Sequence, residues 1–463
     1  MIDPISASAA AIAAAVRSGA TSAVAVTRAH LDHIEAREPA LNCFTTVLAE
    51  RALAVARTVD AVVAAGRDPG PLAGVPFAVK DLFDIAGVTT LAGSRIRRDA
   101  PPAAQDATIV ARLSAAGAVL LGAQVMDEFA YGFTTENAHY GATRNPRDPA
   151  HVAGGSSGGS AASVAAGMVP LALGTDTNGS IRVPAAFCGV FGLKPTYGRL
   201  SRSGVFPFVD SLDHAGAFAR SVPDLALAYD VMQGPDPSDP VQVARPVEPA
   251  SEALASGIDG LHIATLGGWF REGAEAATLE AVDRVAAALG ARDSVELPEA
   301  ARARAAAFCI TAAEGAALHL PTLRSRPDEY DPATRDRLLA GALLPGSVVV
   351  QAQRLRRWFR EQAARLFAQY DVLLAPATPG TAPLVGQATM MLGDREVPVR
   401  PNLGLYTQPL SFIGLPIVCV PVARPGALPL GVQIVAAPWA EATALRVAAW
   451  LERRGVVAAP VAG

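Results

Sequence analysis

The stretch AGGSSGGSAA, residues 153–162, contains four glycines and three serines and carries no charge. The residues after it are apolar and periodic, whereas a flexible linker has polar, mobile flanks. A phosphate-binding loop of the GxxxxGK[ST] type needs a lysine directly after the glycines, and none is present. Residues 154–158 do fit G-x-S-x-G, so a nucleophile elbow with a downstream base such as His319 is an alternative, although the preceding NPRDPAHVA (145–153) is turn-rich.

A second glycine-containing turn follows in GTDTNGSIRVPAAFCG (174–189). The short apolar run VPLALG (169–174) leads into this turn, which presents Ser180. Backbone N–H groups in such a turn can point at one spot, as an oxyanion hole requires. Ser180 is therefore a candidate nucleophile, although no histidine lies near it in the sequence.

A lysine offers the base that Ser180 needs. Lys80 lies in PFAVKD (76–81), a run with the composition of a buried strand. Burial disfavours the charged form of lysine and lowers its pKa, which makes the neutral amine available as a proton acceptor.

Short apolar strands alternate with helices over much of the chain. Helices are predicted over 22–38 and 46–66, and from about 221 to 375 helices dominate. Strands are predicted within 75–81, 118–123, 162–176, 188–198, 371–379, 417–423 and 430–438. The proline-rich segment 234–250 is expected to be a loop that leaves the core. This alternation is typical of an α/β domain with a covered sheet.

Composition limits the possible functions. The 463 residues are 51% hydrophobic and 18% charged, with a formal net charge of −4. Basic clusters such as RIRRDA (95–100) are balanced by acids elsewhere, so no nucleic-acid partner is expected. The uncharged segment Val152 to Thr175 is too rich in glycine and serine for a membrane span.

The cysteines and the N-terminal residues indicate a cytoplasmic protein without a metal. Neither a zinc site nor a disulfide scaffold is expected, because four well-separated cysteines form no CxxC pair: Cys43, Cys188, Cys309 and Cys419. The first residues, MIDPISASAA, lack the basic start and apolar core of a signal peptide.

Together, GGSSGGS (154–160), GTDTNGSIRVPA (174–185) and AVKD (78–81) resemble the amidase signature family of Ser–cis-Ser–Lys amide hydrolases. The likeness continues through MDEFAYGFTTENAHYGATRNPRDP (126–149) and other long motifs, and is weakest over 235–370. The resemblance implies one α/β domain over 1–463, with a mixed twisted central sheet covered by helices on both faces. Its core motifs span about 70–222 and 371–440, and a more helical variable region spans about 235–370.

The resemblance also assigns catalytic roles. Ser180 is the expected nucleophile, Lys80 the base, and Ser156 the middle member that follows a cis peptide bond. The expected oxyanion hole consists of backbone N–H groups of Thr177, Asn178, Gly179 and Ser180. Arg182 is expected to hold the nucleophile loop rather than the substrate. Many members have D-x-G-G-S where this chain has Asn178, a residue that tolerates unusual backbone dihedrals. No cofactor is implied.

The implied substrate is a small anionic amide. Glutamine-using members hold the substrate ammonium with an acidic residue where this chain has Gly404, so glutamine is disfavoured. GGWF (267–270), YTQP (406–409) and AAPWAE (436–441) are similar to segments of members that hydrolyse 1-carboxybiuret. We therefore expect conversion of 1-carboxybiuret to urea-1,3-dicarboxylate and ammonia. The alternatives are the glutamine-hydrolysing component of a tRNA-dependent amidotransferase and a stand-alone amidase of broad specificity.

Two further residues are candidates for substrate binding. Arg337 matches a substrate-binding arginine of glutamine-using members, and a cation suits an anionic substrate. Tyr131, after DEFA, is a candidate pocket residue. The alternatives are a helix-surface arginine and a packed aromatic side chain. The resemblance further implies a heterodimer with a small helical accessory protein, and a dimer of such heterodimers.

Overall fold

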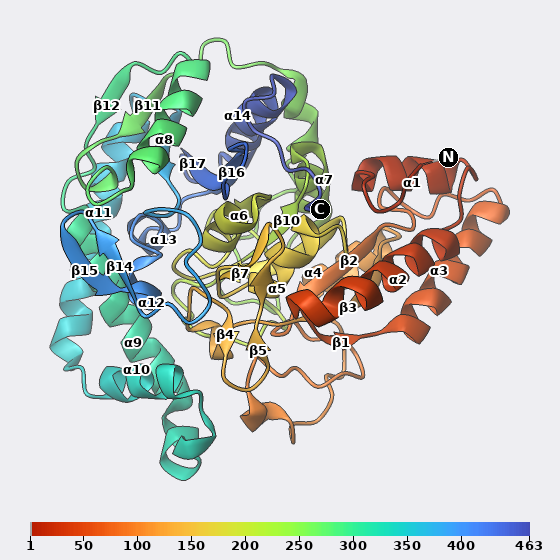
Figure 1. Cartoon of the computed structure of the whole chain (residues 1–463), viewed down its shortest axis with the longest axis horizontal. Helices are drawn as coiled ribbons and strands as arrows, with labels where there is room; N and C mark the ends of the chain where they lie inside the picture. Colours follow the sequence, from red (N-terminus) through yellow and green to blue (C-terminus); the bar gives the residue numbers. More distant parts are fainter. Residues whose placement is uncertain (1) are drawn as a thin grey trace.

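The computed structural model describes residues 2–463, and one sheet of eleven strands lies at its centre (Figure 1). In spatial order the strands are β1 (Phe44–Val47), β3 (Val119–Gln124), β2 (Pro76–Lys80), β8 (Leu171–Asp176), β10 (His214–Ala219), β9 (Phe191–Lys194), β16 (Ile417–Val422), β17 (Leu430–Ala436), β13 (Val372–Pro376), β11 (Ile263–Leu266) and β12 (Asp293–Val295). β2 runs parallel to both its neighbours, as does β11, and the other pairs are antiparallel. The predicted mixed sheet is confirmed.

Three two-stranded hairpins lie outside this sheet. They are β4 (Glu136–Asn137) with β5 (Gly141–Ala142), β6 (Arg144–Asn145) with β7 (Asp148–Val152), and β14 (Thr389–Leu392) with β15 (Arg395–Pro398).

Helices surround the sheet (Figure 1). The first seven are α1 (Ala9–Arg17), α2 (Ala23–Leu41), α3 (Ala49–Ala64), α4 (Thr108–Ala115), α5 (Gly158–Ala165), α6 (Arg182–Cys188) and α7 (Val222–Met232). The next seven are α8 (Ala276–Ala288), α9 (Ala300–Ser325), α10 (Pro332–Ala342), α11 (Gly346–Phe367), α12 (Val399–Asn402), α13 (Gln408–Phe412) and α14 (Glu441–Arg453). Short 3-10 turns are η1 (Arg95–Arg97), η2 (Glu128–Ala130), η3 (Ser251–Ala255), η4 (Gly268–Phe270) and η5 (Pro327–Glu329).

The central strands are buried on both faces. Every residue of β2, β8, β10, β16 and β17 is buried, so side chains that point in either direction are covered. The run VLLGA, which precedes Gln124 in β3, contains no polar side chain and fits this position. In a strand with one face exposed to solvent, apolar and polar residues would alternate. The helices thus cover both faces of the sheet, as expected.

Most predicted elements are present, with shifts of a few residues at their ends. The predicted helix over 22–38 is α2, and Ser22 caps it by accepting a 3.0 Å hydrogen bond from Ala25 N. Segment 234–250 contains no helix or strand, as predicted.

Four strands of the sheet were not predicted from the sequence: β1, β10, β11 and β12. The residues of β10 are HAGAFA, and alanine and glycine have weak strand propensity. This segment is a strand because it lies between β8 and β9, so long-range pairing outweighs local preference. β11 and β12 lie in the region where helices were expected to dominate.

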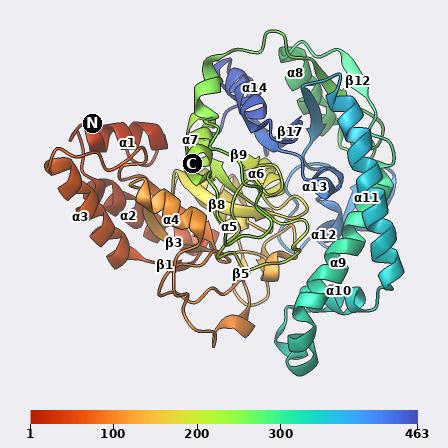
Figure 2. The ribbon, with the colours of Figure 1, turned by 180° about the vertical axis from the view of Figure 1, so that it is seen from behind.

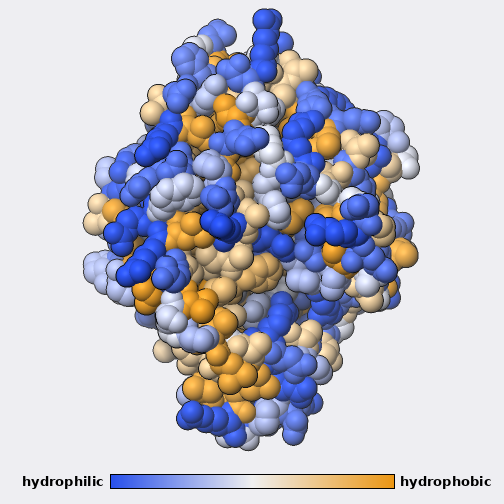
Figure 3. All heavy atoms as spheres, turned by 90° about the vertical axis from the view of Figure 1, so that its left-hand side faces the viewer, coloured by the Kyte–Doolittle hydropathy of each residue, from blue (hydrophilic) through white to orange (hydrophobic). Residues whose placement is uncertain are grey.

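Helices α9, α10 and α11 form one flank of the molecule (Figure 2). By length and composition α9 is the one continuous helix of residues 2–463 that could cross a membrane, but 44% of its apolar window is buried inside the protein. It packs against α10, α11 and α13. A space-filling view of this flank shows apolar residues gathered at the lower tip (Figure 3).

Candidate active site

Lys80 is the last residue of β2, and its side chain is completely buried. Its Nζ donates hydrogen bonds to Ser156 Oγ at 2.8 Å and to Thr175 Oγ1 at 2.9 Å. Burial lowers the pKa of Lys80 from 10.5 to about 7, although nearby carboxylates, Asp127 foremost, act in the opposite direction. Near neutral pH much of this amine is uncharged, and an uncharged amine can accept a proton.

Ser156 lies in the glycine-rich loop between β7 and α5 and is completely buried. The Gly155–Ser156 peptide bond is cis, as the family resemblance implied. Gly155 has no room for a side chain, because a Cβ atom there would lie 2.1 Å from Asp127 Oδ2 and 2.7 Å from Thr134 N. The glycine therefore lets the loop lie directly against the segment that carries Asp127 and Thr134, next to Ser156.

Ser180 lies in the tight loop that connects β8 to α6. Its side chain is nearly buried, and the loop begins directly after the end of β8 that carries Thr175. Among the hydrogen bonds of residues 2–463, none joins the Ser180 hydroxyl to Ser156 or Lys80. The structure thus joins Lys80 to Ser156 directly and places Ser180 in the neighbouring loop.

Side chains from three other segments hold the loop of residues 177–181, which carries the predicted nucleophile Ser180 and is called the nucleophile loop below. Thr177 Oγ1 donates to Asp213 Oδ1 at 2.6 Å. Thr407 Oγ1 donates to the Asn178 carbonyl at 2.7 Å, and Asn178 Nδ2 donates to Thr311 Oγ1 at 2.9 Å. These bonds leave the backbone N–H groups of residues 177–180 without an acceptor in the described part of the chain. The groups predicted to form the oxyanion hole are therefore available to a ligand.

Gly179 adopts a backbone conformation that only glycine tolerates. Its φ is +140°, and a Cβ atom would lie 2.2 Å from Thr407 Oγ1. Thr407 can therefore lie directly against the loop and bind the neighbouring Asn178 carbonyl.

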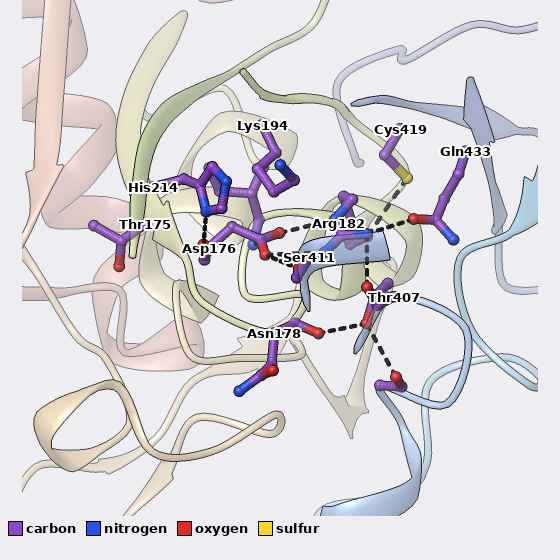
Figure 4. Close-up of polar contacts among 12 residues, drawn as sticks. Thr175, Asp176, Asn178, Arg182, Lys194, His214, Thr407, Ser411, Cys419 and Gln433 are labelled. Atoms are coloured by element: carbon purple, nitrogen blue, oxygen red, sulfur yellow. Dashed lines mark hydrogen bonds and ion pairs between the residues drawn. The ribbon is translucent and has the colours of Figure 1, made fainter. Parts of the chain in front are cut away.

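Arg182 anchors the base of the loop and is completely buried (Figure 4). Its Nε and Nη2 donate to the two carboxylate oxygens of Asp176 at 2.9 and 3.0 Å. Its Nη1 donates to the Thr407 carbonyl at 3.1 Å and to Gln433 Oε1 at 2.6 Å, and Nη2 also donates to Ser411 Oγ. The guanidinium holds the pKa of Asp176 well below its usual range. Arg182 thus holds the loop, as expected.

Loss of the Arg182 guanidinium should destabilise the protein. Arg182→Met leaves the Asp176 carboxylate buried without its partner, and breaking a buried pair in this way typically costs about 3–5 kcal/mol. Denaturant unfolding measures the change. The matched control is Arg302→Met on α9, because the Arg302 side chain is 75% exposed and its ion pair with Glu299 contributes at most about 1 kcal/mol. Equal stability of the two variants would contradict the anchoring role.

Asp127 contacts the serine loop but was not predicted from the sequence as a site residue. Its backbone N–H donates to the Ser156 carbonyl at 3.3 Å, and its Oδ2 accepts from Thr135 N at 3.0 Å. Burial raises the pKa of Asp127, while the charges of Arg400, Arg337 and Lys80 oppose that change. Asp127 thus braces the serine loop and partly offsets the positive charge beside it. Its position in MDEFAYGF was visible in the sequence, but no spacing rule connects that position to residue 156.

Tyr131 and Arg337, the two predicted substrate residues, lie together. Arg337 Cζ lies 4.0 Å from the centre of the Tyr131 ring, and Arg337 Nη2 donates to the Tyr131 carbonyl. The Tyr131 ring also stacks on Phe208 at 4.8 Å between centres. Arg337 is therefore not a free surface arginine, since it is half-buried and bound to an aromatic side chain.

In glutamine-using members of the family, the residue at the position of Gly404 is expected to bind the ammonium group of the substrate. In this chain the Phe133 ring occupies the space that a side chain at this position would need. A Cβ atom on Gly404 would lie 2.4 Å from Phe133 Cζ, and the same ring lies 3.3 Å from a Cβ built on Gly179. The Phe133 ring therefore fills the space between these two glycines. Residue 404 offers no carboxylate and has no room for one.

Residues 2–463 contain no cluster of three or more histidine, cysteine or acidic side chains placed to hold a metal ion.

The fold and the site together define a hydrolase of amide bonds. The sequence matches the amidase family over residues 25–445, and the chain belongs to this family of amidase signature enzymes. It is accordingly an amidohydrolase that cleaves amide C–N bonds.

Several relatives match almost the whole chain. AtzE, the 1-carboxybiuret hydrolase component of Pseudomonas sp. (strain ADP), is 54% identical over 444 residues, which covers 95% of this chain and 97% of that protein. GatA-type proteins follow: the glutamyl-tRNA(Gln) amidotransferase component of Carboxydothermus hydrogenoformans is 40% identical and covers 92% of this chain and 93% of its own length. A solved structure described as a vestigial protein complex that reveals the evolutionary origins of an s-triazine catabolic enzyme superposes with a TM-score of 0.96 at 52% identity. That match covers 98% of this chain and 99% of the other.

Proposed function

We propose that the protein hydrolyses 1-carboxybiuret to urea-1,3-dicarboxylate and ammonia, with an acyl-enzyme formed on Ser180. The observation that carries the mechanism is the buried Lys80, hydrogen-bonded to Ser156 and with its pKa lowered to about 7. The 54% identity to AtzE, a 1-carboxybiuret hydrolase component, and the lack of space for an acidic side chain at Gly404 support this choice of substrate.

In the proposed acylation, Ser180 Oγ attacks the terminal amide carbon. Its proton passes to Ser156 Oγ while the Ser156 proton passes to neutral Lys80. Backbone N–H groups of Thr177, Asn178, Gly179 and Ser180 stabilise the oxyanion, which is consistent with their lack of protein acceptors. The proton returns through Ser156 to the leaving nitrogen, and ammonia departs.

Water then attacks the acyl ester. Lys80 and Ser156 again take up the proton and return it to Ser180 as the ester bond breaks, and the urea-1,3-dicarboxylate product leaves. The two half-reactions use the same proton path, so one hydrogen-bonded Lys80–Ser156 pair serves both.

Ammonia release should separate this function from glutamine hydrolysis. We expect release from 1-carboxybiuret by the purified protein without tRNA, and none from glutamine. Glutaramate is the matched control, because it is glutamine without the α-ammonium and has the same spacing of carboxylate and amide as 1-carboxybiuret. Turnover of glutamine at least equal to that of glutaramate would contradict the proposal. Broad turnover of simple neutral amides would favour a stand-alone amidase instead.

Serine substitutions should separate the proposed roles. Ser180→Ala should abolish acylation, and Ser156→Ala should lower kcat by at least about 100-fold because the proton path is broken. Mass spectrometry of the trapped acyl-enzyme locates the modified residue. Ser160→Ala is the control, since that hydroxyl lies in the first turn of α5 and donates only to the Leu173 carbonyl. Acylation of any residue other than Ser180 would contradict the mechanism.

Activity should rise with pH as Lys80 loses its proton. Because the pKa of Lys80 in the folded protein is lowered to about 7, kcat/KM should increase below pH 7 and level off above it. The free energy of unfolding should also rise with pH between 7 and 10.5, since the unfolded chain binds more protons at Lys80 there. A kcat/KM profile that is flat through pH 7 would exclude Lys80 as the base.

The proposal includes a partner protein. The related solved structure is described as a protein complex, which supports a partner for this chain. The resemblance to the family implies that the partner is a small helical accessory protein and that two such heterodimers associate. The proposed reaction uses neither nucleic acid nor a membrane. The four free cysteines fit a reducing compartment such as the cytoplasm.

A further inference from the structure

Arg304 on α9 is a half-buried cation bound only to neutral groups. Its Nε donates to Gln408 Oε1 at 2.8 Å, and its Nη2 donates to Asn402 Oδ1 at 2.9 Å and to the Pro401 carbonyl at 2.8 Å. Its Cζ lies 5.1 Å from the centre of the Phe308 ring. In the described chain its Nη1 donates to no protein group, so this guanidinium has unused donors.

No carboxylate neutralises Arg304. Among residues 2–463 it forms no ion pair, whereas Arg182 is paired with Asp176. Burial lowers the pKa of Arg304 to about 10, and no nearby charge acts in either direction. The side chain is therefore still protonated at neutral pH, and its positive charge is uncompensated.

Arg304 is connected to the nucleophile loop indirectly, through neighbouring residues on two elements. Gln408, which accepts from Arg304, directly follows Thr407, and Thr407 binds the Asn178 carbonyl. Thr311 lies two turns after Arg304 on α9, hence on the same helix face, and accepts from Asn178 Nδ2. One face of α9 thus runs along the loop that presents Ser180.

Beside Arg304 a buried donor lacks a partner. Gln408 is 1% exposed, and its Nε2 donates to no group in the structure because its Oε1 is turned toward Arg304. An unsatisfied buried donor typically costs about 1–3 kcal/mol, so such a group points to a ligand atom. An acceptor that reaches both Gln408 Nε2 and Arg304 would satisfy the donor and neutralise the cation.

We propose that Arg304 and Gln408 form the subsite that binds the carboxylate of an anionic amide substrate, beside the nucleophile loop. This inference rests on the proposed function and deepens it, because it names the groups that select for negative charge. Arg337 differs in its surroundings: it stacks on Tyr131 and donates to the carbonyls of Tyr131 and Ala333.

A pair of ligands that differ in charge tests the subsite. Calorimetry on Ser180→Ala measures the Kd of glutaramate, which has a carboxylate, and of glutaramide, which is its neutral diamide. We expect Ser180→Ala to bind glutaramate more tightly. Adding Arg304→Gln should weaken glutaramate binding by about 10- to 150-fold, the usual contribution of a hydrogen bond to a charged group, with less than about 3-fold change for glutaramide.

Two further variants separate charge from folding. Gln408→Glu is nearly isosteric and keeps an oxygen acceptor for Arg304. Because the new carboxylate neutralises the Arg304 charge, this variant should lose affinity for glutaramate but not for glutaramide, as Arg304→Gln should. Arg302→Gln, on the same helix with a side chain that is 75% exposed, should leave both Kd values unchanged. In the wild-type background, Arg304→Gln should raise KM for 1-carboxybiuret more than it lowers kcat.

Three results would overturn the inference. They are no preference of the Ser180→Ala protein for glutaramate, equal loss of both ligands in Arg304→Gln, and an unchanged Kd for glutaramate in Gln408→Glu. The binding measurement requires no turnover. If the protein binds glutaramate more tightly than glutaramide but releases no ammonia from 1-carboxybiuret, the proposed reaction is wrong. The proposed carboxylate subsite would still be supported by the binding data.

Discussion

The site depends on a lysine side chain that is fully buried without a carboxylate partner. Burying an ammonium group without a charged partner costs free energy. This cost favours the neutral amine and lowers the pKa of the lysine. Lys80 has only the hydroxyls of Ser156 and Thr175 as partners, and a hydroxyl can accept from the amine or donate to it. The sheet position at the end of β2, between β3 and β8, fixes this amine in place.

The other buried cations of the region show how partners determine the role of a charged group. Arg182 is matched by Asp176 and serves as an anchor. Lys194, at the end of β9, is also completely buried and donates to the carbonyls of Pro195 and Leu415, so its partners are backbone acceptors. Arg182 also donates to the Ser411 hydroxyl, but its main partner is a carboxylate. Of these three groups, Lys80 alone has hydrogen bonds to side-chain hydroxyls and to no other group in the described residues, and hydroxyls can relay a proton.

Local sequence was sufficient for the elements that depend on local patterns. The apolar runs at β2, β3, β8, β13, β16 and β17 predicted strands, and the serine cap at Ser22 predicted the start of α2. β10 could not be predicted from HAGAFA, because its pairing with β8 and β9 decides its conformation. The direct contact of Lys80 with Ser156 was expected from family resemblance alone, since 76 residues separate the two in the chain. Asp127 and Arg304 were missed because their partners lie on other elements, and no motif connects them.

The ring of Phe133 against Gly404 also limits how this active site can evolve. An acidic residue introduced at position 404 would place its Cβ against that ring, so the ring would have to move or be replaced by a smaller side chain. The effect of a substitution at position 404 therefore depends on the residue at position 133, a case of epistasis that arises from one steric contact.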